Sequence, residues 1–270
     1  MGPFGRTCPR LPTREGGTDV GRFDGKRALV TGGASGIGLG TAQLLAAEGA
    51  QVAVLDREVP SAEPGGLHYF AADVTDDAAV REAVSRAIEV LGGLEVLVNC
   101  AGIGAQGRVE DNDDAEWHHV FDVNVVGMVR VTRACLPALR ASAPGAIVNV
   151  ASIAALTGLP ERALYGATKG AVLSLTLGMA ADLLRDGIRV NAVSPGTTDT
   201  PWIGRLLDRA EDPEAERAAL SARQPHGRLV SVSEVADAIA YLASPTASST
   251  TGMWLFVDGG MANLRVRPQR

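Results

Sequence analysis

The feature that most constrains the fold of this chain is an alternation of two kinds of segment. From Lys26 onward, short runs rich in valine, isoleucine and leucine alternate with longer alanine- and leucine-rich stretches whose apolar residues recur at helical spacing. The expected strands are 27–30, 51–55, 68–71, 94–98, 146–150, 189–193 and 254–257. The expected helices are 36–48, 76–91, 114–140, 163–185 and 233–243. The alternation therefore predicts an α/β fold, in which a doubly wound parallel sheet of about seven strands carries helices on both faces.

The organisation along the chain indicates one folded domain. No stretch has the composition of an interdomain linker and no internal repeat is found, so we expect a single domain over residues 25–262. Residues 1–24 carry glycine, proline and arginine without the apolar core of a secretory signal, and we expect a mobile extension there. Residues 263–270 are expected to form a tail. The segment at about 198–228, which includes the helical stretch DPEAERAALSARQ, could form a lid over a site.

The charge balance excludes one class of partner. The chain has 25 basic and 31 acidic residues, a net charge of −6 and a sequence pI near 5.3, so it lacks the basic footprint of a nucleic-acid module. Three uncharged stretches, 28–47, 141–160 and 238–257, are long enough to span a bilayer. Each is interrupted by clusters of glycine, proline, serine or threonine, and we therefore expect no membrane span.

The cysteines and histidines favour neither a disulfide framework nor a metal site. Cys8, Cys100 and Cys135 are odd in number and widely spaced, which fits the reducing cytoplasm. His118 and His119 are neighbours in sequence, so their side chains point to different sides of a helix and do not form a metal-binding pair.

A glycine-rich turn follows the first expected strand. The strand RALV leads into the sequence TGGASGIG at 31–38, after which an apolar helix pattern begins. Glycines at such a turn allow the backbone to approach a pyrophosphate, whose charge lies against the free amides of the helix N-terminus. The turn predicts a dinucleotide site of Rossmann type, formed by Gly32, Ser35, Gly36, Ile37 and Gly38.

The end of the second strand indicates which dinucleotide is bound. Asp56 ends the run QVAVLD, where a carboxylate can accept hydrogen bonds from the adenosine ribose and repel a 2′-phosphate. This favours NAD over NADP, although Arg57 beside it could instead bind that phosphate. Asp73 follows the third strand and could contact the adenine, or it could cap a helix.

Three side chains form a candidate reactive group. Tyr165 and Lys169 are four residues apart and therefore lie on the same face of a helix. An ammonium at that distance favours the phenolate form of the tyrosine, which can then exchange a proton with an alcohol or carbonyl oxygen. Ser152 follows the strand AIVNV, at the sheet edge where open α/β proteins bind ligands.

Taken in order, these motifs resemble the short-chain dehydrogenase/reductase family over residues 24–260. The resemblance rests on the turn at 31–38, the NCAG segment at 99–102, Asn124 in VNVVG, the YGATK segment at 165–169, and VDGG at 257–260. Ser152 and the Pro195–Gly196 pair also match. The chain departs from the family pattern at Cys100, where many members have a second asparagine, and we expect this to alter local packing more than chemistry.

The resemblance implies roles for individual residues. Tyr165 would be the acid/base, Lys169 would promote its ionisation and hold the nicotinamide ribose, and Ser152 would polarise the substrate oxygen. Asn124 would kink its helix and anchor a water relay to Lys169. Ser35 is not basic, unlike the turn residue of many NADP-dependent members, which supports NAD. The residues expected to line the dinucleotide are Gly32, Ser35, Gly36, Ile37, Gly38, Asp56, Asp73, Val74, Asn99, Ala101, Gly102, Tyr165, Lys169, Pro195, Gly196, Thr197 and Thr200.

A closer resemblance points to an acidic substrate. RALYGATK, PGTTDTPW and RQPHGR are similar to segments of cytosolic-type 3-hydroxybutyrate dehydrogenases and bacterial 2-keto-3-deoxy-sugar-acid dehydrogenases. By that resemblance Arg162 and Arg223 would hold the carboxylate, while a further arginine of the hydroxybutyrate enzymes falls on Leu206, next to Arg205. Trp202, at the start of the expected lid, is a substrate candidate and could equally anchor the lid to the core.

These observations favour an NAD-dependent oxidoreductase that interconverts a secondary alcohol and a ketone, with a small hydroxy acid or sugar acid as substrate. Two alternatives are an NADP-dependent ketoacyl- or steroid-type carbonyl reductase, which Asp56 disfavours, and a protein that senses NAD(H) without turnover. The resemblance also implies a homotetramer, which would pair through a small-residue face on the helix that carries Ala167, Ala171, Leu175 and Met179.

Overall fold

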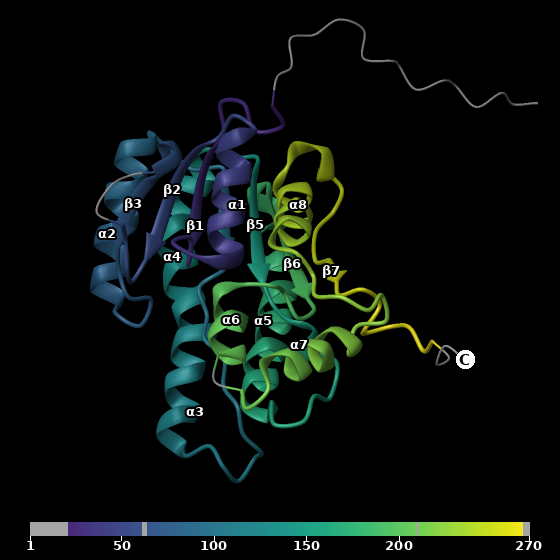
Figure 1. Cartoon of the computed structure of the whole chain (residues 1–270). Coiled ribbons are helices and arrows are strands. Elements are labelled where there is room, and N and C mark those ends of the chain that lie inside the picture. The colour runs from purple at the N-terminus through teal and green to yellow at the C-terminus, as the bar shows by residue number, and fades with distance from the viewer. Residues whose placement is uncertain (1–20, 61–63, 209, 267–270) are drawn as a thin grey trace, which may run out of the picture.

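The computed structural model describes residues 21–60, 64–208 and 210–266. Its strands form one parallel sheet in the order β3-β2-β1-β4-β5-β6-β7 (Figure 1). The strands are β1 (Arg27–Thr31), β2 (Gln51–Asp56), β3 (His68–Ala71), β4 (Val96–Asn99), β5 (Gly145–Val150), β6 (Ile188–Pro195) and β7 (Trp254–Val257). The predicted seven-stranded parallel sheet is therefore confirmed.

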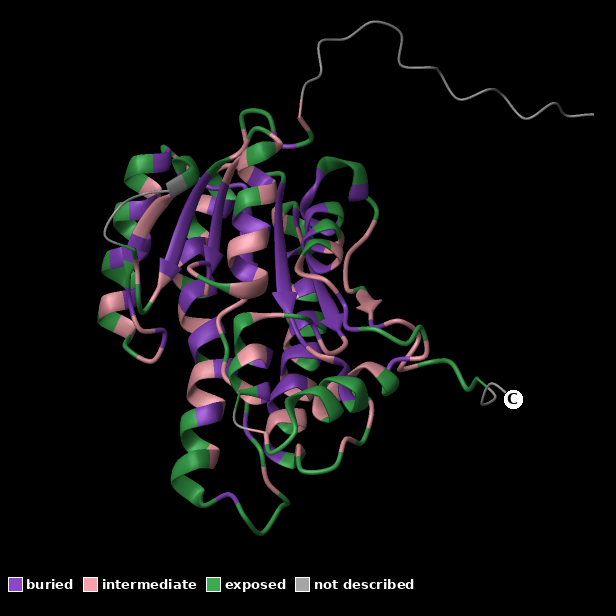
Figure 2. Cartoon of the chain, in the orientation of Figure 1, coloured by how far each residue is buried: buried purple, intermediate pink, exposed green. Residues whose placement is uncertain are grey.

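Two layers of helices bury the sheet. On one face lie α2 (Asp77–Leu91), α4 (Gly127–Ala141) and α5 (Ala163–Leu183), whose apolar side chains share one core with the strands. On the other face, α1 (Gly36–Ala47) and α8 (Val232–Ala243) pack against a second core. The strands between the layers are buried on both sides (Figure 2), as their valine- and leucine-rich sequences predict. Short 3-10 turns lie at η1 (Pro64–Gly66), η3 (Ile153–Ala155), η4 (Leu184–Asp186) and η5 (Pro245–Ala247).

Polar residues begin several of the helices. The Asp76 carboxylate accepts hydrogen bonds from the amides of Ala78 and Ala79 at the start of α2. Ser231 and Glu234 form a reciprocal capping box at the start of α8. Such caps satisfy amides that have no partner within the helix, and each typically stabilises a helix by about 1 kcal/mol.

The long helix expected over 114–140 is divided in the structure. It consists of α3 (Asp114–Phe121), a π-helical turn η2 (Asp122–Val126) and α4. The helix expected over 163–185 ends at Leu183, and the 3-10 turn η4 follows it. The π turn is the irregular point of the first helix, and Asn124 lies within it.

The lid segment contains two helices with a small core of their own. These are α6 (Pro201–Leu207) and α7 (Pro213–Ala222), which lie below the carboxyl ends of the strands in Figure 1. Their buried side chains come from both helices and from the chain that follows them: Ile203, Leu207, Leu220 and Leu229. The lid, about residues 198–228, thus has a small hydrophobic core of its own.

The packed part of the chain begins before residue 25, the boundary expected from the sequence. Phe23 is fully buried in the core shared with α1 and α8, and Arg22 forms an ion pair with Glu48. Residues 1–20 of the expected extension, including Cys8, and residues 267–270 of the expected tail lie outside the described residues. One helix, Ala163–Asp186, is long and apolar enough to cross a membrane by length and composition. It packs against the sheet here.

Candidate active site

The candidate site lies at the carboxyl edge of the sheet. The connections of the chain reverse direction between β1 and β4, and open α/β proteins bind ligands at such a switch point. A cavity of about 860 Å³ opens at this edge, and the loops after β1, β2, β4, β5 and β6 line it together with α5 and the lid. This is the size range of small-molecule and cofactor sites.

The glycine-rich turn brings the backbone of β1 close to the loop after β4. Gly32 has φ +65°, and a Cβ on it would lie 2.8 Å from the Cα of Ala101. The Thr31 hydroxyl accepts hydrogen bonds from the amides of Cys100 and Ala101, at 3.0 and 3.1 Å. Ser35, the N-cap of α1, does not cap the helix with its side chain. The free amides of the α1 N-terminus therefore face the cavity, as an anion site requires.

Two carboxylates also line the cavity: Asp56 ends β2, and Asp73 follows β3. Asp56 Oδ2 accepts a hydrogen bond from the amide of Ala34 at 2.9 Å, which holds the side chain beside the turn. Asp73 accepts hydrogen bonds from the amide and the hydroxyl of Thr75, at 2.9 and 2.7 Å, and these bonds lower the pKa of Asp73. Arg57 points largely into solvent and pairs with Glu58 at 3.7 Å.

The expected reactive side chains meet at the same cavity. Lys169 is buried, and its Nζ donates a hydrogen bond to the carbonyl of Val150 at 2.9 Å. The same Nζ lies 5.8 Å from the ring centroid of Tyr165. Ser152 is the N-cap of η3, and its Oγ accepts a hydrogen bond from the amide of Ala154 at 3.1 Å. Tyr165, Lys169 and Ser152 all line the cavity.

Asn124 supports this group without reaching the cavity. It is fully buried, and its side chain exchanges hydrogen bonds with the backbone of Ile103, at 2.8 and 2.9 Å. Its Nδ2 also donates to the Thr168 hydroxyl at 3.1 Å. A Cβ on Gly102 would lie 3.1 Å from Asn124 Oδ1 and 3.5 Å from Lys169 Nζ. Asn124 thus fixes the loop after β4 against α5, and its water relay stays a prediction.

Asn99 is a correction to the expected cofactor set. It lies in β4 with its side chain 2% exposed, and Nδ2 donates to the hydroxyl of Thr132 at 3.0 Å and to Asn149 Oδ1 at 2.9 Å. Side chains alternate along a strand, so Asn99 shares the side of Leu97, which packs in the core with α2 and α4. Asn99 therefore does not line the cavity, whereas every other residue of the expected cofactor set does.

The three expected substrate residues, Arg162, Trp202 and Arg223, all line the cavity, and the part lined by the two arginines is called the acid end below. Arg162 is half-buried, and its Nη1 donates to the carbonyls of Ala105 and Glu161, each at 3.2 Å. Burial lowers the pKa of Arg162, and the nearby charge of Arg223 lowers it further. Two guanidinium groups far apart in sequence thus share one end of the cavity. Trp202 packs on Gly104, where a Cβ would lie 2.8 Å from the indole, so it both anchors the lid and lines the cavity.

Residues outside the expected site also line the cavity. Arg205 and Leu206, one turn after Trp202, are among them, and the resemblance placed a further substrate arginine on Leu206. His119 lies on the side of Asp73, whose pKa its charge lowers further. No spacing in the sequence indicates that His119 faces the cavity. Among the described residues there is no cluster suited to a metal ion.

The chain is similar to known oxidoreductases along nearly all of its length. The family model described as enoyl-(acyl carrier protein) reductase matches residues 32–262. The 2-keto-3-deoxy-L-fuconate dehydrogenase of Xanthomonas campestris pv. campestris is 38% identical, over 90% of this chain and 82% of that protein. The cis-4-hydroxycyclohexanecarboxylate dehydrogenase of Sinomonas cyclohexanicum is 40% identical, over 88% of this chain and 97% of that protein. The ligand-free structure of Thermoplasma acidophilum aldohexose dehydrogenase superposes with a TM-score of 0.86 at 31% identity, covering 92% of this chain and 98% of that one.

Proposed function

Since this chain belongs to the short-chain dehydrogenase/reductase family of oxidoreductases, we propose that it transfers a hydride between NAD and a secondary alcohol or ketone that carries a carboxylate. The observation that carries the proposal is the placement of Tyr165 beside the buried Lys169 ammonium, at a cavity that also holds Ser152. When bound, the nicotinamide ring supplies or accepts the hydride.

The residues of the chain provide the proton chemistry. Lys169 forms no ion pair with a described carboxylate, and its Nζ lies 5.8 Å from the centre of the Tyr165 ring, which places a cation beside the phenol. Tyr165 can then take a proton from the alcohol during oxidation and return it to the oxygen during reduction. Ser152 Oγ already accepts a hydrogen bond, so its own hydrogen is available to the substrate oxygen.

Asp56 supports NAD as the cofactor. Its carboxylate is held beside the glycine-rich turn, where a 2′-phosphate on the ribose would meet a negative charge. Arg57 also lines the cavity and could offset that charge, but most of its side chain is exposed and it pairs with Glu58. The turn itself offers Ser35 and no basic side chain.

The two arginines at the acid end of the cavity support an acidic substrate. Arg162 and Arg223 repel one another there, and a carboxylate between them would compensate both charges through charge-assisted hydrogen bonds. The names of two relatives fit this chemistry, since one acts on a keto-deoxy sugar acid and the other on a hydroxy carboxylate. We therefore place hydroxy acids and sugar acids ahead of neutral alcohols.

Replacing Tyr165 by phenylalanine tests the proposed chemistry. The Tyr165→Phe variant keeps the ring but loses the proton carrier, so turnover of hydroxy acids with NAD should fall by roughly 10² or more. NADH binding, followed by fluorescence titration, should persist. Tyr241→Phe, at an exposed position on α8, is the matched control and should keep full turnover. If Tyr165→Phe turned over as fast as this control, another group would carry the proton.

We also propose a homotetramer in the cytoplasm. The sequence placed Leu175 and Met179 on the pairing face of α5, but both are half-buried against the cores. The exposed apolar face of this helix instead runs through Ala167, Leu177 and Gly178. A helix face of small and apolar residues fits close packing with a second copy. The two described cysteines are free thiols, as a reducing compartment would keep them.

A further inference from the structure

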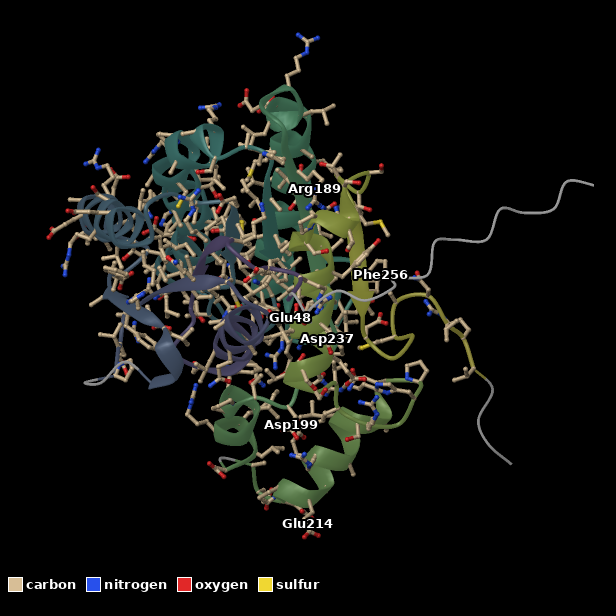
Figure 3. The ribbon with its side chains drawn as sticks, turned by 90° about the horizontal axis from the view of Figure 1, so that it is seen from above. Glu48, Arg189, Asp199, Glu214, Asp237 and Phe256 are labelled. Carbon is tan, nitrogen blue, oxygen red and sulfur yellow. The ribbon has the colours of Figure 1, made fainter. Side chains whose placement is uncertain are left out.

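The lid joins the rest of the protein through a narrow neck. Thr198 and Val230 form an isolated parallel bridge, in which the amide of Asp199 donates to Val230 O at 2.8 Å and the amide of Val230 donates to Thr197 O at 3.0 Å. Asp199, at the base of the lid in Figure 3, also pairs with Arg217 on α7 at 2.6 Å. The outgoing and returning chains of the lid are thus fixed beside one another.

Gln224 fills this neck. Its side chain is 1% exposed, and Nε2 donates to the carbonyl of Arg228 at 2.6 Å and to that of Thr197 at 3.3 Å. Its Oε1 is buried and has no hydrogen-bond partner among the described residues. That oxygen lies against Gly196, where a Cβ would be only 2.3 Å away. The amide therefore touches both chains of the neck and the segment that follows β6.

A primary amide suits this position for a chemical reason. Its nitrogen carries two hydrogens, which match the two carbonyls of Thr197 and Arg228. A carboxylate would place an oxygen against both carbonyls, and an aliphatic side chain would leave the Arg228 carbonyl without its side-chain donor. The contact with Gly196 also requires a residue without a Cβ there. The identity of Gln224 is thus tied to the shape of the Gly196–Thr197 segment.

Gln224 lies between two sets of residues that line the cavity. Gly196 and Thr197 line it at the end of β6, in the expected cofactor set. Arg223, the residue before Gln224, lines it at the acid end and lies close enough to Arg162 to lower the pKa of that guanidinium. We propose that Gln224 is a positioning residue that couples occupancy of the nicotinamide site to the position of Arg223, a role that rests on the proposed function.

The coupling follows from the contacts. A cofactor packed against Gly196 and Thr197 restricts that segment, and Gln224 transmits the restriction to the adjacent Arg223. An arginine that is already ordered loses less conformational freedom when it binds an acid, so the acid binds more tightly. The effect is reciprocal, because a coupling free energy between two sites strengthens both ligands by the same factor. Cofactor would therefore prepare the acid site before the acid arrives.

Chemical modification of Arg223 tests this without any substrate. Phenylglyoxal reacts with accessible arginines, and peptide mass spectrometry measures its rate at each one, with and without saturating NADH. NADH should slow the reaction at Arg223 by about five-fold or more in the unmodified protein, the usual lower range for coupled sites, and by less than about two-fold in Gln224→Met. Arg133, which is exposed, lies outside the cavity and pairs with Asp77, is the internal reference. Its rate should be the same with and without NADH in both proteins.

Two control proteins separate the coupling from a loosened lid. Arg217→Met removes the ion pair with Asp199 but leaves the amide contacts of Gln224, so NADH should still protect Arg223 in it. Gln224→Leu repeats the test if Gln224→Met does not fold by its thermal unfolding curve. Equal protection of Arg223 in the unmodified protein and the Gln224 variants would show direct coverage by NADH and overturn the coupling. The coupling would also be overturned if NADH failed to protect Arg223 in Arg217→Met or in the unmodified protein. A failure to bind NADH in the fluorescence titration would instead contradict the proposed function.

Discussion

Replacing Arg223 by methionine should weaken acid binding and at the same time make the free protein slightly more stable. Neither Arg223 nor Arg162 forms an ion pair with a described carboxylate, and the charge of Arg223 lowers the pKa of Arg162 by more than either Glu161 or Glu216 raises it. The two charges therefore repel each other in the absence of an acid. Removing one should relieve on the order of 0.5 kcal/mol, the scale of exposed charge pairs, and raise Tm by about 1–2 °C.

In the complex with the acid, the same substitution is unfavourable, because it weakens binding of the carboxylate. Losing one partner of a desolvated charge pair costs about 2–5 kcal/mol, and the lower half of that range applies because Arg223 lies on the exposed surface of the lid. A loss of about 2–3 kcal/mol corresponds to a decrease in kcat/KM of roughly 30- to 150-fold. We expect it to appear mainly in KM for the acid, with the affinity for NADH unchanged.

The assay measures kcat and KM over a panel of hydroxy acids and sugar acids with NAD, together with Tm without ligands. Arg217→Met, on the helix α7 that ends just before Arg223 but outside the cavity, is the matched control and should keep the KM. An Arg223→Met variant that keeps the KM for every acid, or that melts below the unmodified protein, would refute the reasoning.

Three further predictions concern the cofactor, the fold and the assembly. Asp56→Ala should narrow the preference for NAD over NADP by about 1–3 kcal/mol, read as the ratio of the two kcat/KM values, and equal efficiency in the unmodified protein would contradict a role for Asp56. Burial raises the pKa of Glu95, but hydrogen bonds from Arg27 outweigh it and the net pKa is lowered. Glu95→Gln should therefore lose about 2–3 kcal/mol in urea unfolding at pH 7, and the difference should vanish as pH falls below about 4.5 and through the folded-state pKa. Sedimentation should show a tetramer at micromolar concentration, and Leu177→Glu on the exposed face of α5 should dissociate it.

The sheet could be predicted from the sequence because most of its strands are short apolar runs that alternate with helices. The ends of the strands were harder to predict from the sequence. The last strand but one was expected to end at 193, yet β6 continues to Pro195, since Ser194 and Pro195 pair with Phe256 and Val257. The break in the helix over 114–140 falls at Asn124, whose side chain bonds Ile103, a residue 21 positions earlier, and the resemblance did imply a kink there. Local patterns do not report such distant partners.

The candidate site could be predicted where a motif identifies both the residue type and its neighbours. This holds for Tyr165, Lys169 and Ser152, which line one cavity as expected. It fails for Asn99, because a motif does not reveal which side of a strand its asparagine occupies. Gln224 gave no signal at all, since nothing in the sequence shows that this polar side chain is buried in the neck of the lid.

The buried amide of Asn99 has a consequence for how the sheet assembles. Parallel strands made of continuous apolar runs can slip past one another by two residues with little loss of packing, so their alignment is weakly encoded. Asn99 stands directly opposite Asn149 in the pairing of β4 with β5, and the Asn149 amide continues to the Thr176 hydroxyl at 2.9 Å. A slipped pair would leave these groups in an apolar layer without partners, at roughly 1–3 kcal/mol for each. We therefore expect the two asparagines to disfavour misaligned pairing of β4 with β5 while the chain folds.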